Sequence, residues 1–264
     1  MTLILNEIHL LNGLKDTFQI AAADRRITRG NNIESPRKKL FAIPFLKATV
    51  SYFGLASFTK ANKETYLSEW LPQFIRASSH CSSLEQFSFE LSETLNNTIP
   101  LKIRKENRSG FHLSGYNNIS LPEFWHFSNI PGMTGLYYNK PVEKYGVPTS
   151  DFLNRDVISH FKYDGINLNS AINGVQTYRN GELITHVMAS EELDKAMGKI
   201  MEYPNFNRPT TIELYADYVK FKFEIISFIY KNWAKKKIIA KPIDVIIIKR
   251  DGLYEKKKGK WTRI

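Results

Sequence analysis

Thr2 directly follows Met1, and an Ala-Ala-Asp-Arg-Arg-Ile-Thr run occupies residues 22–28. A threonine hydroxyl is a poor nucleophile until a base removes its proton. If Thr2 became the first residue, its own α-amine, with a pKa of roughly 7.7–8, would suit that role near neutral pH. Thr2 could then supply both nucleophile and base. The alternative is that the chain simply begins with a hairpin.

The other residue types that carry chemistry form no recognised pattern. The sequence has no phosphate-binding glycine loop, no Gly-x-Ser-x-Gly turn and no His-Glu-x-x-His helix. Cys81 is the single cysteine, so no internal disulfide can form. We expect neither a metal site nor a cofactor, because the histidines are scattered without ligand-like spacing, at 9, 80, 112, 126, 160 and 186.

The first hundred residues predict strands followed by helices. Residues 3–11 and 17–24 are predicted to form a hairpin with an enlarged turn near Asn12-Gly13, and 39–44 and 48–57 a second pair of strands. Apolar residues at helical spacing predict a helix over 62–79, with Asn62 as its N-cap, and another over 84–95.

The rest of the chain is less regular. Residues 109–118 and 122–130 predict two short strands, 131–170 an irregular insertion, and Asn180-Gly181 a hairpin turn. Helices are predicted over 190–202 and 211–235, then a strand over Ile243–Ile248 and a solvated basic tail over 253–264. This order favours two sheets with helices outside them, within one domain spanning 1–264.

Composition and charge limit the classes of function that the chain can have. The chain has 264 residues, 42% of them hydrophobic and 24% charged, which is ordinary for a globular protein. The net charge is +11, but residues 231–264 hold twelve Lys or Arg against three acidic residues, so the excess is local. Without a nucleic-acid-binding motif, nucleic acid is not the expected partner. We expect no membrane segment and no secretory signal, and therefore a cytoplasmic protein.

Two segments together resemble the proteasome β-subunits and their bacterial ring-forming relatives. The N-terminal segment contains the leading Thr, the Ala-Ala-Asp-x-Arg-x-Thr stretch, the lysine of "KKLFAI" and the strand "ATVSYFGLAS" with its glycine. Near the other end, "KPIDVIIIKRDGL" is similar to the family's last strand. The resemblance covers residues 2–95 well and 189–252 in outline.

That resemblance implies an α+β fold, the four-layer αββα sandwich of N-terminal-nucleophile hydrolases. It implies a threonine-type peptidase or amidohydrolase in which Thr2, exposed by removal of Met1, attacks the substrate carbonyl. Lys39 matches the active-site lysine and Asp24 the aspartate that holds it.

By the same resemblance, other positions shape the substrate site. Gly54 matches the oxyanion-hole glycine, Arg26 a neighbour that shapes the site, and Thr28 the residue whose backbone grips the substrate. The implied substrate is a peptide or unfolded protein, and the implied assembly a homo-oligomeric ring, with which an ATPase partner is compatible.

The sequence departs from the family where the N-terminal amine is oriented. The expected Asp-x-x-Ser-Gly before the last strand is replaced by Lys-Lys-Ile-Ile-Ala at 236–240. Ser114-Gly115 and Asn173-Gly174 are the only candidates for the family's other Ser-Gly element. The first hairpin is also longer than usual. An inactive proteasome-like shell or binding subunit is therefore the alternative function.

Overall fold

The structure is a computed structural model that describes residues 2–11, 16–29, 32–60, 62–134, 137–150, 174–181, 185 and 191–264. The second half of the predicted insertion, 151–170, lies outside these residues, as do Met1 and the predicted turn residues 12–15.

Six strands form the larger sheet, in the order β14-β1-β2-β15-β16-β17, and all neighbours are antiparallel. The predicted strands at the N-terminus and at Ile243–Ile248 are confirmed as its centre. The bounds are β1 Leu3–Leu10, β2 Thr17–Asp24, β14 Gly174–Gly181, β15 Ile243–Lys249, β16 Gly252–Lys257 and β17 Lys260–Arg263.

Five strands form the second sheet, in the order β13-β10-β9-β6-β5. The two strands predicted within 109–130 are its β9 and β10, paired from Pro122 with Tyr116 to Ser128 with Gly110. The bounds are β5 Leu40–Ile43, β6 Ala48–Gly54, β9 Ser109–Tyr116, β10 Pro122–Ser128 and β13 Thr149–Ser150.

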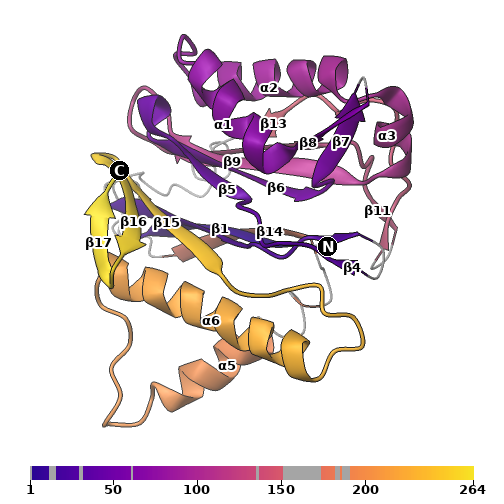
Figure 1. Cartoon of the computed structure of the whole chain (residues 1–264). Coiled ribbons are helices and arrows are strands. Elements are labelled where there is room, and N and C mark those ends of the chain that lie inside the picture. The colour runs from indigo at the N-terminus through magenta and orange to yellow at the C-terminus, as the bar shows by residue number, and fades with distance from the viewer. Residues whose placement is uncertain are drawn as a thin grey trace.

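The two sheets pack face to face, as Figure 1 shows. Successive side chains of a strand point to opposite faces of the sheet, so each strand contributes side chains to two hydrophobic clusters. In β1, Ile4 joins the apolar cluster between the sheets, whereas Leu3 and Leu5 join the cluster beneath a helix. The sheets are therefore buried on both faces, which explains why β1 is buried along its whole length.

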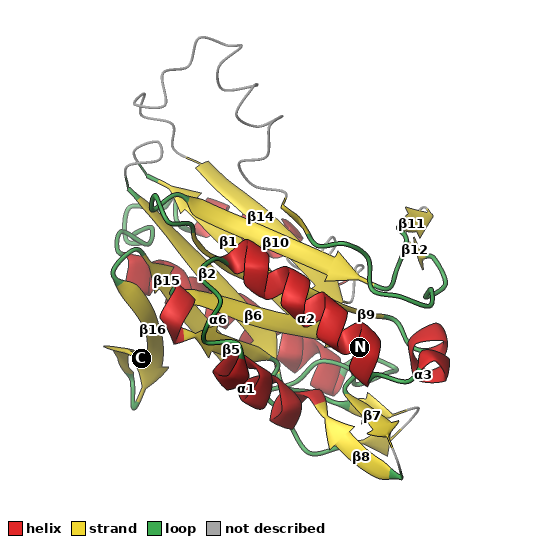
Figure 2. Cartoon of the chain, turned by 90° about the horizontal axis from the view of Figure 1, so that it is seen from above, coloured by secondary structure: helices red, strands yellow, loops and turns green. Residues whose placement is uncertain are grey.

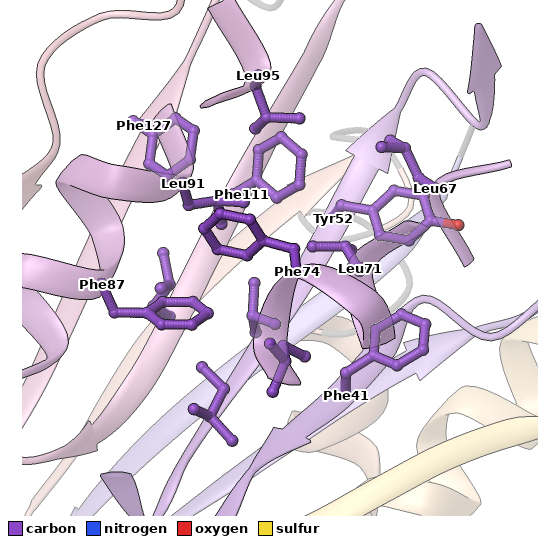
Figure 3. Close-up of a cluster of buried hydrophobic side chains, with 14 of the residues drawn as sticks. Phe41, Tyr52, Leu67, Leu71, Phe74, Phe87, Leu91, Leu95, Phe111 and Phe127 are labelled. Atoms are coloured by element: carbon purple, nitrogen blue, oxygen red, sulfur yellow. The ribbon is translucent and has the colours of Figure 1, made fainter. Parts of the chain in front are cut away.

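The outer face of the five-stranded sheet is covered by α1 (Leu67–Ala77) and α2 (Leu84–Thr98), seen lying across it in Figure 2. Their apolar stripes meet the sheet in a cluster rich in aromatic rings (Figure 3). Phe87 and Leu91 of α2 and Phe111 of β9 are all completely buried there. Ser83 caps α2 by accepting a hydrogen bond from the Gln86 amide.

The outer face of the six-stranded sheet is covered by α6 (Ile212–Asn232). Thr211 caps this helix through the Leu214 amide, and its buried residues include Val219, Phe223 and Ile226. The helix α5 (Glu191–Ile200) lies beyond α6 and has no buried residue (Figure 1). Both helices fall where the sequence predicts them.

Short elements complete the described chain. They are the ribbon strands β3 (Thr28–Arg29) and β4 (Asn32–Ile33), β7 (Ser57–Lys60) and β8 (Lys63–Tyr66), and β11 (Met133–Thr134) and β12 (Tyr137–Tyr138), with the 3₁₀ turn Pro44–Leu46 and helix α3 (Leu101–Glu106).

The predicted α+β class, a four-layer αββα sandwich, is wrong: the fold is β-rich. Within the described residues seventeen strands accompany five α-helices. In these residues the helical cover of the six-stranded sheet is a single helix, α6, because α5 buries none of its residues. Most of the added strands lie in the predicted insertion over 131–170, in the predicted tail over 253–264 and at the start of the predicted helix over 62–79.

Three local predictions are also wrong. Residues 253–264 form most of the hairpin β16–β17 that extends the large sheet, not a solvated tail. Asn62 does not cap a helix: it lies in the β7–β8 turn with φ of 62°, and α1 begins at Leu67. Asn180 and Gly181 are the last residues of β14, not a hairpin turn.

Among the helices of the described part, none is long and apolar enough to cross a bilayer.

Candidate active site

The candidate site lies where the end of β2, in the six-stranded sheet, meets the start of β5, in the five-stranded sheet. Asp24 is the last residue of β2 and Lys39 immediately precedes β5 of the other sheet. Thr2 immediately precedes β1, whose Ile4 pairs with Ala23. The pairing places the start of β1 beside the end of β2, so tertiary structure brings together the three predicted catalytic positions.

The carboxylate of Asp24 joins these segments. Its Oδ1 accepts hydrogen bonds from the Leu3 amide at 2.9 Å and from Lys39 Nζ at 3.1 Å. Its Oδ2 accepts from the Arg26 amide at 3.0 Å. Asp24 is fully buried. Three donors satisfy a carboxylate that would otherwise be costly to bury, and one of them belongs to the residue next to Thr2.

The amine of Lys39 is held from two sides. Nζ also donates to the carbonyl oxygen of Arg26 at 2.5 Å, and the residue is only 1% exposed. Burial lowers the pKa of Lys39, an effect that the nearby Asp24 charge opposes. Because Leu3 N and Lys39 Nζ share one carboxylate oxygen, they lie at most about 6 Å apart. Lys39 is therefore a near neighbour of the Thr2–Leu3 peptide.

Thr2 itself is 3% exposed and lies against the end of β14. Leu3 pairs with Gly181, which has φ of +108°. A Cβ at this glycine would overlap the Thr2 carbonyl oxygen. Only glycine fits both the backbone conformation and the space, so Gly181 positions Thr2. Sequence reasoning missed this role because Asn-Gly is also the commonest hairpin-turn signal.

Gly54 ends β6 at the same end of its sheet as Lys39. The Tyr52 amide donates to the Lys39 carbonyl at 3.2 Å, and Gly54 follows two residues later, about 7 Å along the strand. Its φ of +83° and the closeness of the Arg108 carbonyl leave no room for a side chain. This explains the glycine structurally, while its oxyanion role stays a prediction.

Arg26 and Thr28 follow Asp24 closely. The Arg26 backbone contributes both the amide that binds Asp24 and the carbonyl that binds Lys39. Its side chain lines a groove of about 640 Å³ beside Phe228 of α6. Thr28 begins β3 and pairs with Ile33 of β4. That the Thr28 backbone binds the substrate stays a prediction.

The two sequence candidates for amine support do not lie beside Thr2. The Ser114 hydroxyl donates to Gln19 Oε1 at 2.6 Å, in the interface between the sheets. Gly174 pairs with Leu10, at the opposite end of β1 from Thr2, and Asn173 lies outside the described residues.

The segment that replaces Asp-x-x-Ser-Gly is used for packing. Ile238 and Ile239 are buried in the cluster beneath α6, and Ala240 is buried beside them. These apolar side chains can neither donate to nor accept a proton from an amine.

No protein-family model matches the chain, and no curated protein matches it. Its function is inferred from the chemistry of these residues: a threonine whose peptide bond to Leu3 lies near a buried amine of lowered pKa, with the Asp24 counter-charge held by backbone amides.

Proposed function

We propose that the chain is a threonine-type peptidase or amidohydrolase whose nucleophile is Thr2, working in a ring-like homo-oligomer. The observation that supports it most is the Asp24 carboxylate, because its Oδ1 binds both the Leu3 amide and the Lys39 amine. A buried Lys–Asp pair one peptide away from a threonine is an arrangement that can activate its hydroxyl.

In this proposal, cleavage of the Met1–Thr2 bond frees the α-amine of Thr2. The amine takes the hydroxyl proton as Oγ1 attacks the substrate carbonyl, and it then gives that proton to the departing amine. The resulting ester is hydrolysed by water, which returns the proton to Oγ1 and releases the acid. Gly54 N–H would stabilise the oxyanion, and the Lys39–Asp24 pair would favour the deprotonated hydroxyl.

The substrate is proposed to be a peptide or an unfolded protein. An ATPase that delivers unfolded substrate is a compatible partner of a closed ring. A cytoplasmic location is inferred from the single cysteine in a chain of this length.

An inactive proteasome-like shell is the second candidate. The buried, apolar Ile238-Ile239-Ala240 segment favours it, because the resembled family places amine-orienting polar residues there. A nearly buried Thr2, at 3% exposure, also favours it.

Intact-mass measurement with a peptide epoxyketone tests the proposal, because this inhibitor reacts with a threonine hydroxyl and its own free α-amine together. We expect a mass that lacks Met1 and gains one inhibitor adduct. Thr2→Ala should gain none, and Lys38→Met should react like the wild type. Retention of Met1 would exclude Thr2 as an N-terminal nucleophile.

Loss of Met1 without an adduct, using several inhibitor peptides, would favour the shell. Light scattering on the same sample tests the ring: a single high-mass species is expected, and a monomer at working concentration would contradict the assembly.

A further inference from the structure

Three side chains of different chemistry converge in the turn between α1 and α2. His80 and Cys81 lie in the turn, and Glu90 lies on α2, which follows it. His80 Nε2 is 2.9 Å from Glu90 Oε2, and Cys81 Sγ is 3.3 Å from the same oxygen and 4.0 Å from His80 Nε2. Cys81 is buried, whereas His80 remains exposed. The cluster is thus reachable from solvent on one side.

These separations lie within about half an ångström of those between the ligands of a tetrahedral zinc ion. Zn–N, Zn–O and Zn–S bonds of about 2.0–2.3 Å place tetrahedral ligand atoms about 3.4–3.6 Å apart. The three separations given above bracket this range. Shifts of about half an ångström would bring nitrogen, oxygen and sulfur to bonding distance of a common centre.

The surroundings orient the three ligand atoms. His80 Nδ1 lies 3.3 Å from the Ala77 carbonyl, so an Nδ1–H that donates there leaves Nε2 for a metal. The hydroxyl of fully buried Ser78 donates to Glu90 Oε1 at 2.6 Å and leaves Oε2 turned to the cluster. The Cys81 amide donates to the Ser78 carbonyl at 3.0 Å, which closes the turn. Metal ligands are commonly held by such outer hydrogen bonds.

We propose that His80, Cys81 and Glu90 form a zinc-binding site with a fourth position open to water or to an external ligand. Mixed nitrogen, sulfur and oxygen donors suit Zn²⁺, whereas Mg²⁺ and Ca²⁺ prefer oxygen alone. The site would join the α1–α2 turn to the second turn of α2. It is independent of Thr2 and therefore does not rest on the proposed peptidase activity.

Binding exchanges a proton for the metal. Without metal, the Cys81 thiol donates its proton in a hydrogen bond to Glu90 Oε2 at 3.3 Å. Zn²⁺ would form the Zn–S bond to the thiolate as that proton leaves to solvent. No oxidation or reduction is involved.

Titration of the purified, tag-free full chain tests the site, after removal of metal by a chelator that is then dialysed away. Zinc is added in competition with a chromophoric chelator, and Co²⁺ is added to a second sample. We expect one Zn²⁺ per chain and a thiolate-to-Co²⁺ charge-transfer absorption. Cys81→Ser should lose that absorption, and both Cys81→Ser and His80→Ala should bind Zn²⁺ at least 10-fold more weakly.

Matched variants separate this site from the rest of the molecule. Glu93→Gln, an exposed neighbour of Glu90 on α2, and Thr2→Ala should bind zinc like the wild type. Ser78→Ala should weaken binding about 10-fold through Glu90. Because a variant can fail to fold, each is checked by circular dichroism, and the Co²⁺ spectrum of the wild type decides independently. No metal bound by the wild type, or equal binding by folded Cys81→Ser, would overturn the proposal.

Discussion

At the scale of single residues, the most constrained group is the buried ion pair of Asp24 and Lys39. Both side chains are at most 1% exposed, and every described polar contact of the pair is with backbone or with each other. A buried pair gives little net stability compared with an apolar pair, but removing one partner leaves the other uncompensated. A lysine held by Asp24 close to the Thr2–Leu3 peptide is what the proposed chemistry needs.

Replacing Lys39 with Met should lower the free energy of unfolding by about 3 kcal/mol, because it would leave the Asp24 carboxyl buried without its partner. Lys38→Met is the matched control. Lys38 is only half-buried, and its replacement should change stability by no more than about 0.5 kcal/mol. Urea unfolding of both variants measures the difference. Equal stabilities would contradict a buried Lys39–Asp24 pair.

Gly181 and Gly174, at opposite ends of β14, make a second matched pair. Gly181→Ala should destabilise the protein by about 1–3 kcal/mol and abolish any reaction of Thr2, because the added Cβ displaces the Thr2 carbonyl. Gly174→Ala meets no atom and should be close to neutral. Thermal unfolding and inhibitor labelling give the two readouts. A reactive, stable Gly181→Ala protein would show that Thr2 is not held by this contact.

At the scale of elements, α6 packs over a buried polar cluster on the outer face of β1. Lys222 Nζ lies 3.5 Å from Glu7 Oε1 and 3.1 Å from Asp194 Oδ1 of α5. His9 Nε2 is 2.9 Å from Glu7 Oε2, and the His9 ring stacks on Phe18. The cluster ties both C-terminal helices to the first strand.

This cluster should make stability fall in acid. Burial acts to raise the pKa of Glu7, but the hydrogen bond with His9 and the charge of Lys222 outweigh it and lower the pKa below 4.5. The stability that the Glu7 contacts contribute is therefore fully present above pH 4.5. It is lost as the pH falls through the lowered pKa that Glu7 has in the folded state. Glu7→Gln should flatten that part of the curve in urea unfolding at pH 3–7. If Glu7→Gln lost as much stability between pH 7 and pH 3 as the wild type does, Glu7 would not be paired in the folded protein.

The apolar face of α6 can be tested with two phenylalanines of one helix. Phe223 is 2% exposed in the core cluster, and Phe221 is 43% exposed. Phe223→Ala should cost about 3–5 kcal/mol through lost burial and the cavity left behind. Phe221→Ala should cost less than about 1 kcal/mol. Similar losses in chemical denaturation would mean that α6 is not docked on the sheet as described.

At the scale of the whole molecule, the two sheets are joined by polar as well as apolar contacts. Gln19 of β2 accepts from the Ser114 hydroxyl of β9 at 2.6 Å and donates to the Gly115 carbonyl. Both side chains are fully buried between the sheets. Such a bond fixes the register of one sheet on the other, because a shift would leave both groups unsatisfied.

Gln19→Leu should therefore destabilise the molecule by about 1–3 kcal/mol, since it leaves the Ser114 hydroxyl and the Gly115 carbonyl buried without their partner. Adding Ser114→Ala should restore part of the loss, because the hydroxyl is then removed as well. A double-mutant cycle by urea unfolding measures the coupling. Strictly additive losses would show that the two side chains do not interact.

Local patterns in the sequence predict most of the elements. Apolar residues at helical spacing located α2 and α6, and apolar runs located β1, β2 and β15, because these periodicities reflect burial on one or both faces. The acidic residues that follow Ser190 located α5. The sequence also singled out Asp24 and Lys39 as a pair, through a resemblance rather than through any signal of their own. The sequence-based prediction was wrong for the fold class and for 253–264, where the consecutive lysines 256–258 at the β16–β17 turn predict a solvated tail.

Which distant residues meet depends on the packing of the sheets and helices. Strand pairing brings Gly181 to Thr2 across almost 180 residues of chain, and no local pattern marks that contact. His80 and Cys81 are adjacent in the chain, yet they become a metal-ligand cluster only because α2 turns Glu90 back over them. Local periodicity reports burial, whereas chemistry depends on distances between side chains, which the packing of sheets and helices sets.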